Sequence, residues 1–133
     1  MDSLVNYTLI TNEIKLINNH ISGQAFNINP QIHRKIESID KNKTAVTYTL
    51  EIKSTQEKPF PIDLTVSLTG IFDTHNLEEK DVDNFLKVQS CQILFPQIRT
   101  IVATLTSSAL MPPLLLPVVD ARKLFAEEAK TEE

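Results

Sequence analysis

Apolar and polar residues alternate most regularly in the middle of the chain. From Val46 to Ile52 every second residue is apolar, and the residues between them are Thr and Glu. The same alternation runs over residues 60–72, where Gly70 takes one of the apolar positions. A period of two predicts β-strands that have one dry face and one wet face. Because the stretch 54–59 between the two runs is polar, we expect a hairpin connection and an antiparallel sheet with one apolar face.

The first forty residues have a weaker pattern. Ile14 and Leu16 alternate with polar neighbours, but the next two isoleucines fall on the opposite parity. A strand with two apolar faces or a β-bulge produces such a pattern, and Gly23 is a plausible position for the bulge. The Asn-Ile-Asn-Pro stretch at 27–30 predicts a turn. The isoleucines of residues 32–39 then predict a short second strand.

After Phe72 the apolar spacing changes to three and four residues, which is typical of a helix. Asn76, followed three residues later by Glu79, is a weak capping-box signal. We therefore expect a helix over about residues 77–108. Pro96 either kinks this helix or begins a new one at its first turn.

The segment after this helix is unusually apolar for a connection. Its three prolines each fix φ and remove a backbone donor, so the residues among them should be extended. The long apolar side chains on it are Leu110, Met111, Leu114, Leu115 and Leu116. Neighbours on an extended chain point to opposite sides, so at least one of the five should face away from the core. Two interpretations stay open: the residues fill the core alone, or they also form an apolar surface for a partner.

Asp120 is a suitable N-cap for a last helix over about residues 120–130. A sheet with one dry face needs a covering layer, and the C-terminal helices are the available one. With 133 residues, 41% of them hydrophobic, the chain is long enough to form one domain with a modest core. The sequence therefore predicts a single α+β domain over residues 1–133, with strands over about 5–72 followed by the helices.

Charge and the lengths of the apolar runs argue against several classes of protein. A formal net charge of -4 argues against nucleic-acid binding, which needs a basic face. The longest apolar run, residues 109–119, is about half as long as a membrane span. The acidic start shows no signal peptide, and the single cysteine, Cys91, cannot form an internal disulfide. We therefore expect a cytoplasmic protein with no membrane insertion.

Candidate catalytic chemistry is almost absent from the sequence. His20, His33 and His75 lie far apart among polar residues, and none has metal-ligand spacing to Cys91. With only two glycines, the chain cannot form a glycine-rich phosphate loop. The acidic run at 78–83 is explained as a solvated first helical turn. We therefore expect no enzyme, no cofactor and no metal site, and a buried apolar thiol at Cys91.

The second half of the chain resembles the SecB export-chaperone family. The likeness is carried by Gly-Ile-Phe at 70–72, ILFPQIR at 93–99, MPPLLLPV at 111–118 and Leu-Phe at 124–125. Either of the two proline-containing elements alone would be weak, but both at this spacing are fairly specific. The first half of the chain agrees with the family only in its strand pattern.

The resemblance implies a four-stranded antiparallel sheet packed with two C-terminal helices, assembled as a homotetramer that is a dimer of dimers. Such proteins hold unfolded or precursor polypeptides without ATP and deliver them to the export ATPase. Solitary relatives serve as chaperones of toxin–antitoxin systems. The family's client groove is lined by apolar residues around the loop between the helices. Carried over by position, the client-binding candidates are Leu110, Met111, Leu114, Leu115, Leu116, Ile71, Phe72 and Phe85.

This chain departs from the family's pattern at two places. Residues 109–111 are Ala-Leu-Met where the family usually has Gly-Phe or a similar pair before its two prolines, which removes an aromatic ring from the presumed groove. Residues 120–121 are Asp-Ala in place of the common Asn-Phe. The acidic surface on which the family docks its ATPase cannot be placed on this sequence.

We therefore expect a cytoplasmic, ATP-independent holdase that binds unfolded or precursor polypeptides through apolar grooves. Such a holdase should protect several unrelated unfolded proteins from aggregation. The alternative is a SecB-fold chaperone or adaptor dedicated to one partner, such as an antitoxin, which should protect only that partner. An enzyme or small-ligand binder would need a closed pocket with convergent polar groups, and the loop offers none.

Overall fold

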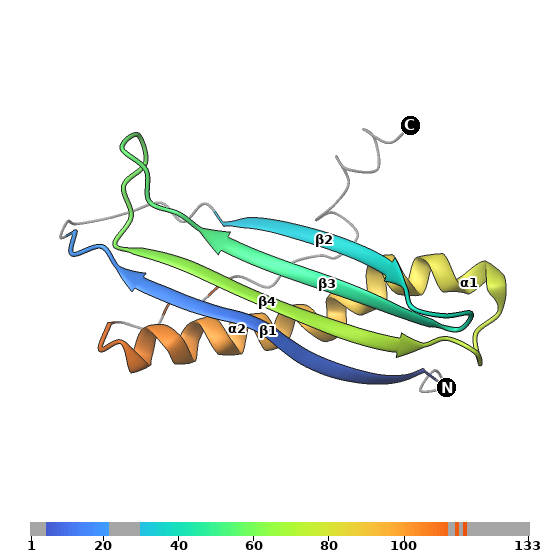
Figure 1. Ribbon diagram of the computed structural model, residues 1–133. Coiled ribbons are helices and arrows are strands. Elements are labelled where there is room, and N and C mark those ends of the chain that lie inside the picture. The colour runs from blue at the N-terminus through green and yellow to red at the C-terminus, as the bar shows by residue number, and fades with distance from the viewer. Residues whose placement is uncertain (1–4, 22–29, 112–113, 115, 117–133) are drawn as a thin grey trace.

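The computed structural model describes residues 5–21, 30–111, 114 and 116 of the chain. Within them the molecule has two layers, a four-stranded sheet and a helical layer that crosses one face of the sheet (Figure 1). This arrangement confirms the expected α+β class and the antiparallel sheet. The expected last helix over 120–130 lies outside the described residues. None of the described helices has the length and apolar character that a membrane span requires.

The sheet consists of β1 (Asn6–Asn18), β2 (Gln31–Ser38), β3 (Lys43–Ile52) and β4 (Ile62–Asp73). The order across the sheet is β1-β4-β3-β2, and every neighbouring pair is antiparallel. Strands β3 and β4 are therefore paired on both sides, whereas β1 and β2 are the two edges of the sheet.

The weak apolar pattern of the first strand has a structural cause. The register between β1 and β4 shifts between Thr11 and Glu13, so a β-bulge interrupts the strand at Asn12. The side-chain amide of Asn12 donates to Thr69 Oγ1 at 2.7 Å across the two strands. Gly23, the position expected for a bulge from the sequence, lies outside the described residues.

Strands β3 and β4 carry the centre of the hydrophobic core. Directly opposite residues of an antiparallel pair share a face, and Tyr48 lies opposite Leu68 while Leu50 lies opposite Val66. These four side chains are 0–3% exposed, because the helical layer packs on this face. The alternation of period two thus corresponds to one dry face, as expected.

The helical layer is formed by α1 (Glu79–Asn84), a π-helical turn η1 (Phe85–Gln89) and α2 (Ser90–Ser108). The expected capping box does not cap α1, because Glu78 is the N-cap residue and its side chain forms no capping hydrogen bond. No new helix begins at Pro96 either: α2 runs through this exposed proline, and the helical geometry changes at η1 instead. A proline inside a helix removes one ladder hydrogen bond, which the long α2 tolerates.

Side chains bond the carbonyl groups of the π-helical turn. Ser90 Oγ donates to the Leu86 carbonyl, and Arg34 on β2 donates to the Lys87 carbonyl at 3.3 Å. Tyr48 Oη lies 2.8 Å from Ser90 Oγ, and because Ser90 gives its proton to Leu86, Tyr48 is the donor of this pair. Burial raises the pKa of Tyr48 to about 12, so the phenol stays protonated. This network joins the helical layer to β2 and β3.

Gly70 makes room for an aromatic ring. A Cβ atom added to Gly70 would lie 2.7 Å from the ring of Phe72, which is fully buried. That ring packs edge-on against Phe85, with centroids 5.4 Å apart, and lies 5.7 Å from the ring of Tyr7. Gly70 therefore takes an apolar position because the neighbouring phenylalanine fills its space.

Candidate functional site

The segment that follows α2 is fastened to that helix. Met111 N donates to the Thr106 carbonyl at 3.0 Å, and Leu114 N donates to Thr106 Oγ1 at 2.8 Å. Arg99 Nε donates to the Leu116 carbonyl at 3.0 Å. Thr106 is only 2% exposed, so these bonds hold the segment against a buried part of the helix.

The eight client-binding candidates taken from the resemblance do not form one surface. Leu116, Phe72 and Phe85 are 0–6% exposed, so these three belong to the core and offer a client no accessible surface. Ile71 follows a residue on the helix-facing side, so its half-buried side chain lies on the opposite face of the sheet. Leu115 lies outside the described residues. Only their positions in the family pattern indicated these residues as candidates. In this chain, packing places some of them in the core and others on different faces of the sheet.

Three of the candidates lie together at the end of α2. Leu110 is 95% exposed, whereas Met111 and Leu114 are half-buried and pack against the core on one side. We call Leu110, Met111 and Leu114 the tip surface. Since Leu116 lies in the core and Leu110 in solvent, the segment both fills the core and presents apolar side chains outward.

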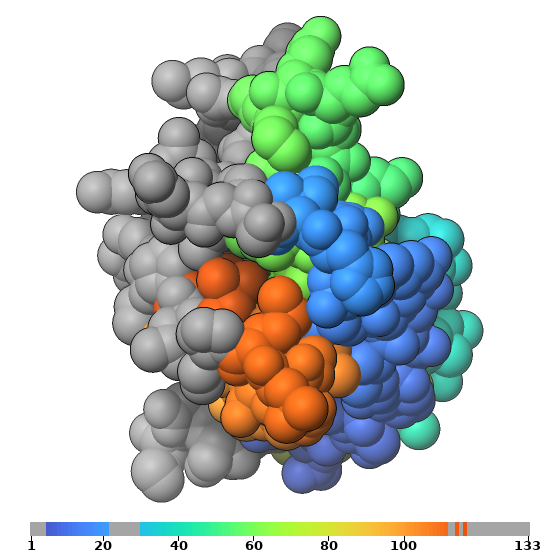
Figure 2. All heavy atoms as spheres, turned by 90° about the vertical axis from the view of Figure 1, so that its left-hand side faces the viewer, coloured from blue at the N-terminus to red at the C-terminus, as the bar shows by residue number. Residues whose placement is uncertain are grey.

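A second apolar surface lies on the edge strand β1, and the candidate set did not include it. Five of its large apolar side chains are 37–48% exposed, and we call these five the β1 apolar edge: Tyr7, Leu9, Ile10, Ile14 and Ile17. Figure 2 shows β1 beside the last turns of α2. The sequence offers one signal for this surface, the isoleucines on both parities, and that signal does not distinguish a bulge from a second apolar face.

The β1 apolar edge reaches both faces of the sheet. Ile14 lies opposite Val66 and shares the helix-facing side, whereas Ile17 lies opposite Asp63 and faces the other way. Among the described strands β1 pairs only with β4, and an edge strand with apolar side chains on both faces is a template for pairing with another chain. Clusters of exposed apolar side chains of this kind usually mark interaction sites.

The face of the sheet opposite α2 has a polar centre. Thr47 Oγ1 lies 2.7 Å from Thr69 Oγ1, and Thr49 Oγ1 donates to Ser67 Oγ at 3.1 Å. These hydroxyl groups bond one another across β3 and β4. No helix or strand of the described residues covers this face (Figure 1).

Three side chains considered for catalysis, Cys91, His75 and His33, are either buried or lie next to an acidic residue. Cys91 is 1% exposed, as expected for a buried thiol, and burial raises the pKa of this thiol. His75 Nδ1 lies 2.7 Å from Asp73 Oδ1, and this hydrogen bond lowers the pKa of Asp73. His33 lies 3.7 Å from Glu51 at the surface. Within the described part of the chain, no three His, Cys, Asp or Glu side chains come together as a metal site.

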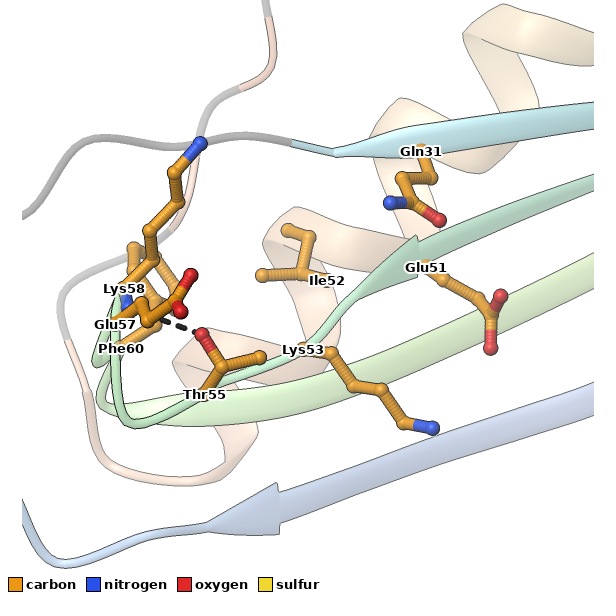
Figure 3. Close-up of a pocket in the computed structure, with 8 residues that line it drawn as sticks. All are labelled: Gln31, Glu51, Ile52, Lys53, Thr55, Glu57, Lys58 and Phe60. Carbon is orange, nitrogen blue, oxygen red and sulfur yellow. Dashed lines mark hydrogen bonds between the residues drawn. The ribbon is translucent and has the colours of Figure 1, made fainter.

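A hollow of about 370 Å³ lies where β3 passes into the hairpin connection. Its lining residues are Gln31, Glu51, Ile52, Lys53, Thr55, Glu57, Lys58 and Phe60. The apolar side chains of Ile52 and Phe60 are buried, and Figure 3 shows the charged end of Lys58 pointing away from those of Glu51 and Lys53. A small-molecule site needs a few polar groups that converge on the ligand. The hollow therefore does not have the chemistry of such a site.

Comparison with known proteins connects this geometry to a family. The family model described as preprotein translocase subunit SecB matches residues 14–132. Protein-export protein SecB of Anaplasma phagocytophilum is 31% identical over 86 residues, which cover 62% of this chain and 54% of that protein. The uncharacterized protein MJ0357 of Methanocaldococcus jannaschii is 27% identical over 130 residues, which cover 92% of this chain and 84% of that one. The chain thus spans about half the length of the matched bacterial SecB protein.

A solved structure has the same fold. It is the Mycobacterium tuberculosis Rv1957 SecB-like chaperone in complex with a ChAD peptide from the Rv1956 HigA1 antitoxin. The TM-score is 0.72 at 15% sequence identity, and the match covers 87% of this chain and 91% of that one. At this identity the likeness shows the fold. Because the family model matches nearly the whole sequence, from residue 14 to residue 132, the chain belongs to the SecB family.

Proposed function

We propose that this chain is an ATP-independent chaperone that holds unfolded or precursor polypeptides by their apolar segments. Its membership of the SecB family and its relatives named as protein-export proteins support this role. The observation that carries the proposal is the tip surface, where Leu110 is 95% exposed beside two half-buried apolar side chains. Covering such a surface with client side chains is favourable by about 25 cal/mol per Å² of apolar area.

The tip surface suits clients of variable sequence. Apolar contact is non-directional, so it does not require one arrangement of hydrogen-bond partners. Met111 adds a flexible, polarisable side chain that adapts to different shapes. The bonds from Thr106 and Arg99 hold the backbone in place, which limits the entropy that binding has to offset. Leu115, which lies outside the described residues, stays a client-binding candidate by its position in the family pattern.

We further propose that a second copy of the chain covers the β1 apolar edge. Edge strands of soluble proteins are normally protected, and β1 is a 13-residue strand with one unpaired side. A twofold axis through Ile14 would set two antiparallel copies of β1 side by side, with Glu13 of one opposite Lys15 of the other. Opposite charges at directly opposed positions favour this register. The step from dimer to tetramer stays an expectation from the family.

Aggregation of two unrelated denatured proteins, followed by light scattering without ATP, tests the chaperone role. We expect the chain to suppress the aggregation of both proteins, and the addition of ATP to leave the result unchanged. Failure to suppress either one at a molar excess of the chain would contradict the proposal. A folded protein of similar charge serves as the control and should not be bound.

The second candidate is a chaperone or adaptor dedicated to one partner. It is favoured by the solved structure of the same fold, whose bound chain is a peptide from an antitoxin. Protection of only one partner, with no effect on unrelated proteins, would select this alternative. Transfer of clients to an export ATPase is a separate step. It requires that the ATPase bind this chain, so the two purified proteins should sediment together.

Sedimentation velocity tests the assembly. Covering β1 by a second copy requires a dimer or a larger species at micromolar concentration. A monomer at all concentrations would contradict the proposed pairing of β1, and it would leave client binding at the tip surface to be decided by the aggregation experiment.

A further inference from the structure

The helical layer changes character at the π-helical turn η1. None of the residues of α1 is buried, and η1 contributes two buried side chains, Phe85 and Leu86. By contrast, α2 contributes seven, and its first two residues, Ser90 and Cys91, are 0–1% exposed. Helix α1 packs mainly on η1 rather than on the sheet. The part of the layer that precedes Ser90 is therefore held less firmly than the part that follows it.

The segment that precedes Ser90 is fastened at its other end by Thr74. The backbone N–H and the side-chain hydroxyl of Thr74 both donate to the Asn42 carbonyl, at 2.8 and 3.1 Å, and Thr74 is buried. Beyond Thr74 most side chains are exposed until η1 begins, and the N-cap residue Glu78 forms no capping hydrogen bond. We call residues 75–89 the strap. Figure 1 shows α1, in the middle of the strap, at the end of the molecule where β2 turns into β3.

The end of the strap next to α2 receives a hydrogen bond from the sheet. In η1 the Ser90 N–H donates to the Phe85 carbonyl, five residues back, and π-helical turns of this kind are rare and frequently found at functional sites. Arg34 lies opposite Tyr48 in the register of β2 and β3, so its side chain is on the helix-facing side. From there its guanidinium donates to the Lys87 carbonyl at 3.3 Å. A hydrogen bond from a charged donor is stronger than one between neutral groups, so the loss of Arg34 should loosen this end of the strap.

We infer that the strap opens and closes on the rest of the subunit, with its hinge just before Ser90 and with Arg34 as its latch. In the closed form the ring of Phe85 packs edge-on against Phe72, and both residues are 0–6% exposed. Lifting the strap carries Phe85 away from Phe72 and exposes both rings to solvent. Arg34 thus controls access to an aromatic surface that the closed form hides. This device belongs to the subunit and does not depend on client binding.

The chain contains its own reporter of this opening. Cys91 is the single cysteine, it directly follows Ser90, and it is 1% exposed. Its reaction with 4,4′-dithiodipyridine, an uncharged disulfide that labels thiols, requires that the structure covering it open first. Opening of the strap exposes little surface, so the labelling rate should hardly change between 0 and about 1 M urea. Labelling through global unfolding would instead become steeply faster with urea over the same range.

Three variants test the latch. Arg34→Met removes the donor but keeps a long side chain, and we expect it to label Cys91 about tenfold faster than the parent does, again with little dependence on urea. Arg34→Lys keeps a charged donor and should lie between the two. Lys35→Met is the matched control, because it changes the net charge equally while Lys35, opposite Thr47, lies on the other face of the sheet. It should label at the parent's rate. Hydrogen exchange of Arg34→Met should become faster at the amides of residues 83–89 and stay unchanged at residues 94–102.

Three results would overturn the inference. A labelling rate of the parent that rises steeply with urea from the start would mean that only global unfolding exposes Cys91, so the strap does not open. A rate in Arg34→Met equal to that of the parent would mean that Arg34 is not the latch. Exchange that becomes equally faster at residues 83–89 and 94–102 would mean that Arg34 supports the whole fold rather than the strap. None of these results bears on the chaperone role, which the aggregation experiment decides.

Discussion

Strands β3 and β1 are both apolar strands of one sheet, yet their side chains lie in opposite environments. On β3, Val46, Tyr48, Leu50 and Ile52 are 0–3% exposed. On β1, the five members of the β1 apolar edge are 37–48% exposed. The difference follows from place in the sheet, since β3 lies between two strands beneath the helical layer and β1 lies at an edge with one side unpaired. Apolar residues thus correspond to burial against the chain's own helix in β3, and to exposed side chains that the proposed dimer would cover in β1.

The largest expected effect concerns the face of the sheet that the helical layer covers. Leu94 on α2 is fully buried over the sheet, so Leu94→Ala should lower the free energy of unfolding by about 3–5 kcal/mol through lost contacts and a cavity. Ile14→Ala, an aliphatic truncation on β1, should cost the folded subunit less than about 1 kcal/mol. Urea denaturation of both variants measures the contrast. Equal losses would mean that β1 is as much a part of the subunit core as α2.

Gly70→Ala tests how tightly the ring of Phe72 packs beside Gly70 on the helix-covered face of the sheet. The added Cβ atom would lie 2.7 Å from the ring of Phe72 and 3.3 Å from Leu94. Because Phe72 is fully buried between Tyr7 and Phe85, the ring cannot move freely, and we expect a loss of about 1–3 kcal/mol in unfolding free energy. Ala45→Gly, on the outward face of β3, is the control for a change in strand propensity alone. A stability equal to that of the parent would show that the ring of Phe72 can shift to make room for the added Cβ atom at little cost.

Asp63 fastens the end of β1 to β4, and this connection should depend on pH. Ser54 N donates to Asp63 Oδ1 at 2.9 Å and the Asn19 amide donates to the same atom at 3.1 Å. These bonds lower the pKa of Asp63 from its ordinary value of 3.8, so their stabilisation is present above about pH 4 and is lost as pH falls through the lower folded value. Asp63→Asn should cost about 1 kcal/mol at pH 7, a modest figure because the group is partly exposed.

Unfolding of Asp63→Asn and the parent at several pH values checks this prediction. The difference in stability between them should shrink below pH 4 and vanish in stronger acid. A difference that is the same at pH 7 and pH 3 would show that the carboxylate charge has no part in holding this end of β1.

The smallest expected effect concerns the β1 apolar edge. In the proposed dimer, Glu13→Lys places a lysine opposite Lys15 at both symmetry-related positions and should weaken association by a few-fold, since exposed ion pairs contribute about 0.2–1 kcal/mol each. The double variant Glu13→Lys with Lys15→Glu restores opposite charges and should recover the parent's association. Sedimentation equilibrium measures both. Recovery would support the register through Ile14, and a double variant weaker than the single one would exclude it.

The sequence predicted β3 and β4 well because one covered face enforces strict alternation on them. It predicted β1 less well, because the bulge between Thr11 and Glu13 shifts the register and the apolar side chains of this edge strand lie on both faces of the sheet. The helix start and η1 were not predictable from spacing, because the carbonyl groups of η1 are bonded by Arg34 and Ser90, which lie outside the turn. Neither side chain carries a local signal of that role.

The sequence indicated a candidate segment but not which of its side chains are accessible. Three prolines and five long apolar side chains indicated the segment after α2, and alternation implied that some members would face outward. Which members do so depends on the bonds of Thr106 and Arg99, and these set Leu116 in the core and Leu110 in solvent. Phe72 and Phe85 agreed with the family's groove by position, but in this chain the two rings pack against each other.

Hydrogen exchange of the whole assembly, with and without an unfolded client, tests most directly whether the two apolar surfaces serve different polypeptides. The β1 amides that do not bond to β4 should be protected before any client is added, because a second copy covers them. The amides of residues 109–111 should gain protection only when the client is present. Fast exchange along the free side of β1, or no change at residues 109–111 in the presence of a bound client, would contradict the assignment.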